Sequence, residues 1–162
     1  MGVSGAGKTA VGSALARAIG VEFVEGDAYH SAENVRKMAA GVPLTDDDRA
    51  GWLRLLAEQL ERSRRANTGM VLASSALKRS YRDVLRTGAP DVRFIHLKGP
   101  RELLAERLRG RHGHFMPPSL LDSQLETLEE PEPDEHAWVY DVSAPVQEIV
   151  ENIVARVSAG RS

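Results

Sequence analysis

Apolar residues recur along the chain at two spacings, one typical of helices and one typical of strands, and the two kinds of segment follow one another. Helical spacing predicts helices at residues 9–19, 31–40, 46–66, 78–86, 100–109, 119–128 and 146–157. Short apolar runs predict strands at 21–25, 70–74, 92–97 and 137–142. The run at 70–74 is continuous, which is typical of a strand buried on both faces. The alternation predicts a three-layer α/β domain with a parallel sheet, whose functional loops lie at the carboxyl ends of the strands.

Capping residues support two of these helix starts. Ser31 can cap the predicted second helix as its first residue, and Thr45 precedes three acidic residues that open the long third helix. Carboxylates in a first helical turn complement the positive end of the helix dipole. Helix capping therefore explains Asp46, Asp47 and Asp48 better than a metal site does.

Composition narrows the class of protein. The 162 residues suit one domain, here 1–162, and 42% are hydrophobic and 27% charged, which is usual for a soluble globular chain. Cysteine is absent, which excludes disulfides, thiolate zinc sites and a cysteine nucleophile. A net charge of −2 gives no sign of a nucleic-acid partner, and no apolar run approaches the roughly 18 residues of a membrane span. We expect a cytoplasmic protein with neither kind of partner.

The chain opens on a complete phosphate-binding (Walker A) motif. Its glycines let successive backbone N–H groups converge on phosphates, and the helix that follows points its N-terminal dipole at the same anion. The lysine would reach the β and γ phosphates of a bound nucleotide, and the threonine hydroxyl would lie on Mg²⁺. The predicted nucleotide-binding residues are Gly2, Val3, Ser4, Gly5, Ala6, Gly7, Lys8 and Thr9.

A strand normally precedes this motif, yet the sequence begins at Met1. In such a fold that strand is central and buried on both faces. Removing four or five large apolar residues, each worth about 1.5–3 kcal/mol, would cost roughly the net stability of a whole domain. We therefore expect the first strand to be missing from this chain and Met1 to be an internal methionine.

Two carboxylates, Glu25 and Asp27, lie at the carboxyl end of the strand predicted at 21–25, beside the phosphate loop. One carboxylate there can hold magnesium through water, and the other can accept the proton of an attacking hydroxyl. An acidic, solvated turn is the alternative interpretation of the same residues.

The sequence resembles the bacterial gluconokinases, a family of P-loop small-molecule kinases, over nearly its whole length. The resemblance rests on these blocks: Gly2 to Thr9, Gly26-Asp27-x-x-His30, Asn34-x-x-Lys37-Met38, Gly41-x-Pro43-Leu44-x-Asp46-Asp47-Asp48-Arg49-x-x-Trp52-Leu53, Ser75-Ala76-Leu77-Lys78-x-x-Tyr81-Arg82-Asp83, Leu97-Lys98-Gly99, Gly113-His114-Phe115 and Leu125-Glu126-x-Leu128-Glu129-Glu130-Pro131. It implies transfer of the γ-phosphate of ATP, with Mg²⁺, to the 6-hydroxyl of D-gluconate.

The resemblance also implies roles for single residues. Asp27 is expected to contact the substrate hydroxyl as general base, and Glu25 and Thr9 to serve the metal. Gluconate is a polyhydroxylated carboxylate, so cations and hydrogen-bond donors should bind it, and the candidates are His30, Arg49, Lys78 and His114.

The family carries a mobile lid, which would correspond to residues 107–128. Arginines in a lid can bring positive charge onto phosphate oxygens, which suggests Arg111 for the γ-phosphate and Arg107 beside the adenine. The neighbouring histidines lack further ligands at zinc spacing. A homodimer is a further expectation from the family.

Two alternatives remain open at this stage. The chain could be a related P-loop kinase for another small hydroxy acid, or an inactive nucleotide-binding remnant that lacks its first strand.

Overall fold

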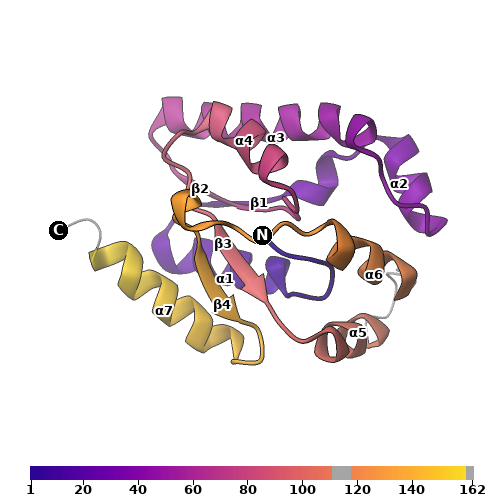
Figure 1. The fold of residues 1–162 in the computed structure, drawn as a ribbon. Helices are drawn as coiled ribbons and strands as arrows, with labels where there is room; N and C mark the ends of the chain where they lie inside the picture. The colour runs from indigo at the N-terminus through magenta and orange to yellow at the C-terminus, as the bar shows by residue number, and fades with distance from the viewer. Residues whose placement is uncertain (111–117, 160–162) are drawn as a thin grey trace.

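The computed structural model describes residues 1–110 and 118–159, and Figure 1 shows their arrangement. The helices are α1 (Lys8–Ile19), α2 (Ala32–Ala39), α3 (Asp46–Ala66), α4 (Arg79–Gly88), α5 (Arg101–Arg109), α6 (Pro118–Thr127) and α7 (Val146–Ala159), with short 3-10 turns at Gly26–Tyr29 and Pro133–Glu135. The strands are β1 (Glu22–Glu25), β2 (Met70–Ala73), β3 (Ile95–Lys98) and β4 (Trp138–Asp141). The predicted alternation of helices and strands is confirmed.

Three layers are visible in Figure 1, with α3 and α4 above the strands and α7 below them. α1 packs against α7 and against β1 and β2. One apolar cluster therefore fills the side of α1 and α7, with Leu15 and Ile153 at its centre, and a second fills the side of α3 and α4 around Leu56 and Leu85. None of the described helices is both long enough and apolar enough to cross a membrane.

All pairing between the described strands is parallel, as the sequence predicts. β1 pairs with β2 from Glu22 opposite Met70 to Glu25 opposite Ala73. β3 pairs with β4 from Ile95 to Lys98 opposite Trp138 to Asp141. Over residues 1–110 and 118–159 the strands form two separate pairs instead of one continuous sheet.

The first two residues bridge these two pairs. The Met1 nitrogen donates to the Ile95 carbonyl at 2.5 Å, and the Leu97 N–H donates to the Met1 carbonyl at 2.9 Å. On the other side, the Gly2 N–H donates to the Ser75 carbonyl at 3.3 Å. Figure 1 accordingly shows the N-terminus at the centre of the molecule, between the two pairs of strands.

Two sequence predictions about strands need correction. The third strand begins at Ile95 and not at residue 92. The first backbone hydrogen bond between this segment and β4 is the one that the Trp138 N–H donates to the Phe94 carbonyl, so the residues before Phe94 are not paired with β4. The second, β2, is not buried on both faces: Ala73 is buried, but Met70 through Leu72 are only half-buried. These residues border a cavity on the side of β2 that faces away from β1.

Candidate active site

The phosphate loop owes its shape to glycine backbone conformations. Gly2, Gly5 and Gly7 have φ values of +148°, +82° and +83°, a region that side chains disfavour. A Cβ on Gly5 would lie 2.7 Å from the Leu104 carbonyl oxygen, and one on Gly2 would lie 2.6 Å from that of Leu97. The backbone can therefore follow this path only with glycine, and Gly7 directly precedes the first turn of α1.

Lys8 and Thr9 open α1 and face different partners. The Lys8 ammonium donates to the Val3 carbonyl at 3.0 Å, across the loop. The Thr9 hydroxyl donates to Glu25 Oε2 at 2.5 Å, which brings together the two residues predicted to serve the metal. A hydroxyl and a carboxylate fit Mg²⁺, which takes one or two protein oxygens and completes its shell with phosphates and water. Among the described residues, no group of three or more His, Cys, Asp or Glu side chains is arranged so that it could hold a metal ion.

Asp27 lies on the 3-10 turn that follows β1, and Trp52 of α3 holds that turn in place. The Trp52 indole N–H donates to the Gly26 carbonyl at 2.8 Å. The same indole stacks on the His30 ring, with centroids 4.3 Å apart and an interplanar angle of 17°. His30 Nε2 lies 3.8 Å from Asp27 Oδ1, and the Asp27 side chain is 65% exposed, so it is open to a substrate.

The surroundings of His30 lower the pKa of its ring. Burial, the largest cause, lowers its pKa; Asp27 opposes this shift, and the nearby Arg49 adds to it. Its Nδ1 atom is buried without a hydrogen-bond partner among the described residues, and its Nε2 atom is the one that faces Asp27. The role of His30 as a hydrogen-bonding group near the substrate stays a prediction.

Arg49 and Lys78, which belong to two separate sequence blocks of the resemblance, both contact Tyr81. The Arg49 guanidinium donates to the Tyr81 hydroxyl at 3.1 Å and lies 5.5 Å from the ring centroid. Lys78 lies 5.6 Å from the same centroid and donates to both Asp46 oxygens at 2.9 and 3.0 Å. The Tyr81 hydroxyl also donates to Asp46. Hydrogen bonds from Tyr81 and Lys78 lower the pKa of Asp46, so the group carries a fixed negative charge between two cations.

The acidic run at the start of α3 divides into structural roles. Thr45 and Asp48 form the predicted capping box, with the Asp48 N–H donating to Thr45 Oγ1 and the Thr45 N–H donating to Asp48 Oδ2. Asp48 also accepts from Lys37 at 2.7 Å, and this bond lowers the pKa of Asp48 to about 2. Helix capping and ion pairing therefore account for Asp48 and ion pairing for Asp46, and Asp47 is a further acidic residue in the first helical turn.

Sequence reasoning assigned no role to Arg82, although it belongs to one of the quoted motifs. Its side chain is fully buried and forms two bonds with Glu135, at 2.6 and 2.7 Å. Arg82 Nη1 also donates to the carbonyls of Ala76 and Leu77 at 3.1 and 3.2 Å. It thus fixes the loop that carries Lys78. The sequence offers one signal for this role: Arg82 lies one helical turn after Lys78, a predicted site residue. Its partner Glu135, however, is 53 positions away and could not be recognised from the sequence.

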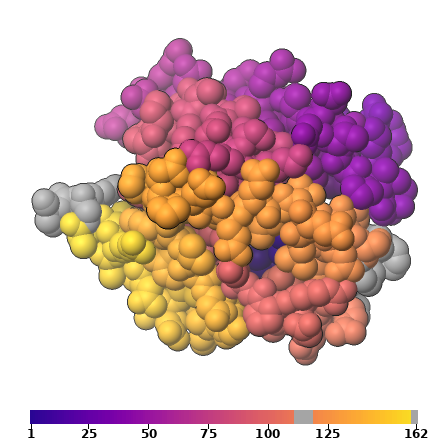
Figure 2. Space-filling model, in the orientation of Figure 1, coloured from indigo at the N-terminus to yellow at the C-terminus, as the bar shows by residue number. Residues whose placement is uncertain are grey.

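Of the three residues predicted to act from the lid, the structure describes only Arg107. Arg107 ends near the phosphate loop: its Nη2 donates to the Val142 carbonyl at 2.6 Å, and Nη1 lies 4.0 Å from where a Cβ on Gly7 would be. Arg111 and His114 lie outside the described residues. Figure 2 shows a hollow in the molecular surface with N-terminal residues, drawn in indigo, at its floor.

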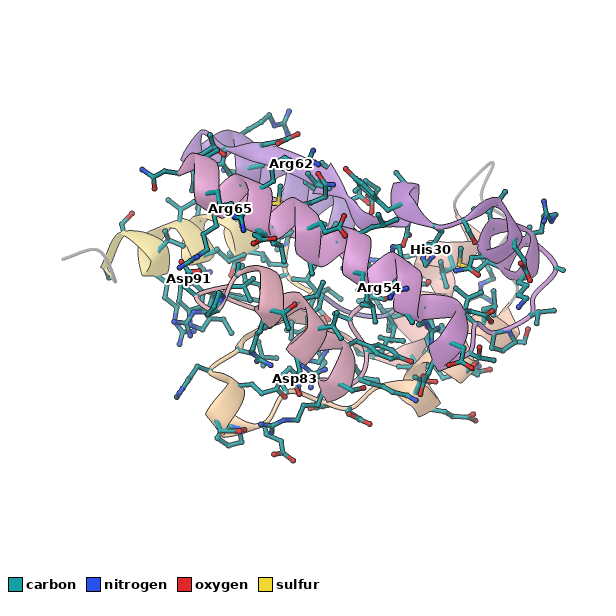
Figure 3. The ribbon with its side chains drawn as sticks, turned by 90° about the horizontal axis from the view of Figure 1, so that it is seen from above. His30, Arg54, Arg62, Arg65, Asp83 and Asp91 are labelled. Carbon is teal, nitrogen blue, oxygen red and sulfur yellow. The ribbon has the colours of Figure 1, made fainter. Side chains whose placement is uncertain are left out.

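Arg62 and Arg65 received no functional role from the sequence. Figure 3 shows them at the end of α3 far from His30, with Arg54 between. Arg65 pairs with Glu61 one turn away on the same helix, at 2.6 Å. These cations therefore lie away from His30, which neighbours Asp27.

Known proteins resemble this chain along almost its whole length. Residues 1–131 match the family described as an AAA domain. The thermoresistant gluconokinase of Escherichia coli (strain K12) is 41% identical over 162 residues, covering 99% of this chain and 93% of that protein. The chain belongs to the gluconokinase family. The gluconokinase of Gluconobacter oxydans (strain 621H) is 53% identical over 135 residues, covering 83% of this chain and 76% of that protein.

A solved gluconokinase agrees in three dimensions. The crystal structure of a gluconokinase from Sinorhizobium meliloti 1021 superposes with a TM-score of 0.88 at 50% identity, covering 98% of this chain and 89% of that one. The gluconokinase family assignment and the P-loop kinase fold expected from the sequence are therefore confirmed.

Proposed function

We propose that this protein is an ATP-dependent gluconokinase that phosphorylates the 6-hydroxyl of D-gluconate, giving 6-phosphogluconate and ADP. The observation that carries the proposal is the Thr9–Glu25 bond of 2.5 Å, because it joins the phosphate loop to the turn that bears Asp27. A phosphate donor and an exposed carboxylate are thereby held at one edge of the strands. The gluconokinase relatives support gluconate as the acceptor.

The donor half consists of backbone and two side chains. The N–H groups of the loop and the N-terminus of α1 bind the phosphates of ATP, and Lys8 neutralises charge on the β and γ groups. Thr9 and Glu25 would hold Mg²⁺, either directly or through its water shell. When bound, the metal supplies positive charge that stabilises the transferring phosphoryl group.

The acceptor half positions the sugar acid. Asp27 orients the 6-hydroxyl and accepts its proton as the hydroxyl oxygen bonds to the γ-phosphorus, while the bond from phosphorus to the ADP oxygen breaks. His30 binds a neighbouring hydroxyl. Arg49 and Lys78, which stand together at Tyr81, bind the carboxylate end of gluconate. Arg111 and His114 complete the proposal from the lid, with Arg111 on the γ-phosphate.

A substrate panel tests this proposal directly. The purified chain is assayed for ADP release with Mg²⁺, ATP and each of D-gluconate, other sugar acids, shikimate and nucleoside monophosphates. We expect turnover with D-gluconate and a product that 6-phosphogluconate dehydrogenase oxidises. Preference for another acid would support the alternative of a related kinase, and ATP binding without any turnover would support an inactive nucleotide-binding protein.

Two further expectations come from the sequence and family alone. A cytoplasmic location and a homodimer are part of the proposal, and size-exclusion chromatography with light scattering of the purified chain checks the second.

A further inference from the structure

The turn that carries Lys78 depends on support from other parts of the chain, because one of its residues has an unfavourable backbone conformation. Ala76 has a φ of +42°, in the left-handed region that alanine seldom adopts. Both Ala76 and Leu77 are almost fully buried. A strained backbone persists only where its surroundings determine it. The contacts that hold residues 75–78, here called the Lys78 turn, therefore determine where the Lys78 side chain begins.

Glu129 bonds to both sequence neighbours of Lys78. Its backbone N–H donates to the Leu77 carbonyl at 2.8 Å, and its Oε2 atom accepts from the Arg79 N–H at 2.7 Å. The Glu129 carbonyl accepts from Arg82 Nη1 at 3.0 Å. The N–H, the carbonyl and the carboxylate of Glu129 therefore all contribute to holding the Lys78 turn.

The bond to Arg79 is a helix cap that comes from a distant part of the sequence. Arg79 is the first residue of α4, so its N–H cannot find a partner inside the helix. Within the described part of the chain, Lys78 at the N-cap position does not cap the helix with its own side chain, which reaches Asp46 instead. Glu129 supplies the missing acceptor from 50 positions away, and its negative charge suits the helix N-terminus.

Five residues before Glu129, the same segment is bound to the phosphate loop. Gln124 lies on α6, and its Oε1 atom accepts from the Ser4 N–H at 2.7 Å, across 120 positions of the sequence. The Leu128 N–H donates to the Gln124 carbonyl at 2.9 Å, so helical bonding continues almost to Glu129. One short piece of chain therefore contacts the phosphate loop at one end and the Lys78 turn at the other.

We propose that Gln124 and Glu129 are positioning residues: the segment 124–129, here called the linking segment, holds the phosphate loop and the Lys78 turn in a fixed relation to each other. Both residues act through the groups that they hold and not on the reacting atoms. The inference rests on the proposed function, because it takes Lys78 as a group that binds the carboxylate of gluconate. That carboxylate is remote from the 6-hydroxyl, so Glu129 should affect acceptor binding and not the chemical step.

The first experiment removes the cap that Glu129 supplies and then restores it. Glu129→Ala loses the acceptor for the Arg79 N–H but keeps both backbone bonds, whereas Glu129→Gln keeps an oxygen that can accept. We expect KM for D-gluconate to rise about threefold to tenfold in Glu129→Ala and to stay within about twofold of the parent in Glu129→Gln. In both variants kcat and KM for ATP should not change. Glu126→Ala, at an exposed glutamate of α6, is the matched control.

The kinetic constants distinguish positioning from a purely structural role. A lower Tm in Glu129→Ala with KM for D-gluconate at the parent value would overturn the proposal. Equal rises in KM in Glu129→Ala and Glu129→Gln would also overturn it, because they would show that the charge matters and not the bond to Arg79. A parent protein that does not turn over D-gluconate would instead contradict the proposed function, and hydrogen exchange then decides whether the linking segment acts as proposed.

Hydrogen exchange tests the linking segment without any acceptor. Bound nucleotide orders the phosphate loop, so saturating ADP with Mg²⁺ should slow exchange of the Glu129 and Arg79 amides in the parent. Gln124→Met keeps the length of the side chain but has no oxygen to accept from Ser4, so the slowing should be lost although ADP still binds. Gln147→Met, at an exposed position of α7, is the matched control. Unchanged slowing in Gln124→Met, or no slowing in the parent, would overturn the proposal.

Discussion

The phosphate loop and the acceptor side of this kinase are built in different ways. The loop is eight consecutive residues whose shape comes from the φ angles of its glycines, and its ligand groups are mainly backbone N–H groups. The proposed acceptor side draws Asp27, His30, Arg49 and Lys78 from three separate segments, which contacts of other side chains, from Trp52, Tyr81 and Asp46, hold in place. A locally encoded site tolerates change around it, whereas an assembled site depends on every packing contact that brings its parts together.

The largest expected effect comes from the phosphate loop itself. Lys8→Ala removes the cation that neutralises the β and γ phosphates, so kcat should fall by about a thousandfold. Steady-state kinetics with saturating D-gluconate measures it. Arg65→Ala, which removes an exposed cation at the far end of α3, is the matched control and should retain full activity. A Lys8→Ala protein with normal turnover would contradict the donor half of the proposal.

Asp27→Asn tests the acceptor side by the same measure. The amide keeps the shape of the side chain but accepts the hydroxyl proton poorly, so kcat should fall by roughly a hundredfold to a thousandfold. ATP binding, followed by titration with a fluorescent nucleotide, should stay unchanged because the phosphate loop is intact. Asp83→Asn, a change at an exposed carboxylate paired with Arg86, serves as control. Weakened ATP binding in Asp27→Asn would show that the two halves are not separable.

The same difference explains how much the sequence could predict. The phosphate loop, the capping box at Thr45 and nearly all helices are local features, and each appears as a short pattern of residue types. The joining of Thr9 to Glu25 was also within reach, because the topology of a parallel sheet brings both to the same edge.

Long-range side-chain partners could not be predicted in this way. Arg49 bonds to Tyr81, 32 positions further along the chain, and Glu135 bonds to Arg82 across 53 positions. Nothing in the composition around Glu135 distinguishes it from the exposed acidic residues nearby. The half-burial of β2 was also unpredictable from its own apolar run, because it depends on what lies along the strand's second edge.

The buried Arg82–Glu135 pair, which holds the loop that carries Lys78, makes the free energy of unfolding depend on pH. Hydrogen bonds from Arg82, the largest cause, lower the pKa of Glu135 from 4.5 to about 2. A depressed carboxyl pKa stabilises the fold above the unfolded value and loses that contribution as pH falls through the folded value. The unfolding free energy should therefore fall by about 3 kcal/mol between pH 4.5 and 2 on account of this group.

Urea unfolding at several pH values isolates this contribution. Glu135→Gln should be less stable than the parent at pH 6 and should lose less stability on acidification, because the group no longer titrates. Glu126→Gln, at an exposed position on α6, is the matched control and should follow the parent curve. If Glu135→Gln and the parent lose stability in parallel, Glu135 is not the group responsible.

The smallest effect should come from Tyr81→Phe, which acts on the acceptor side through position alone. The ring that faces Arg49 and Lys78 remains, but the hydroxyl that accepts from Arg49 and donates to Asp46 is lost. One such network bond is worth about 1 kcal/mol, so KM for D-gluconate should rise about threefold to tenfold. KM for ATP should not change, kcat should stay within about twofold, and Tyr140→Phe on β4 should alter none of the three. A fall in kcat at unchanged KM would contradict this role and show that Tyr81 stabilises the transition state more than the bound substrate. An interaction that only binds the substrate stabilises the bound substrate and the transition state equally, so its loss changes KM and not kcat.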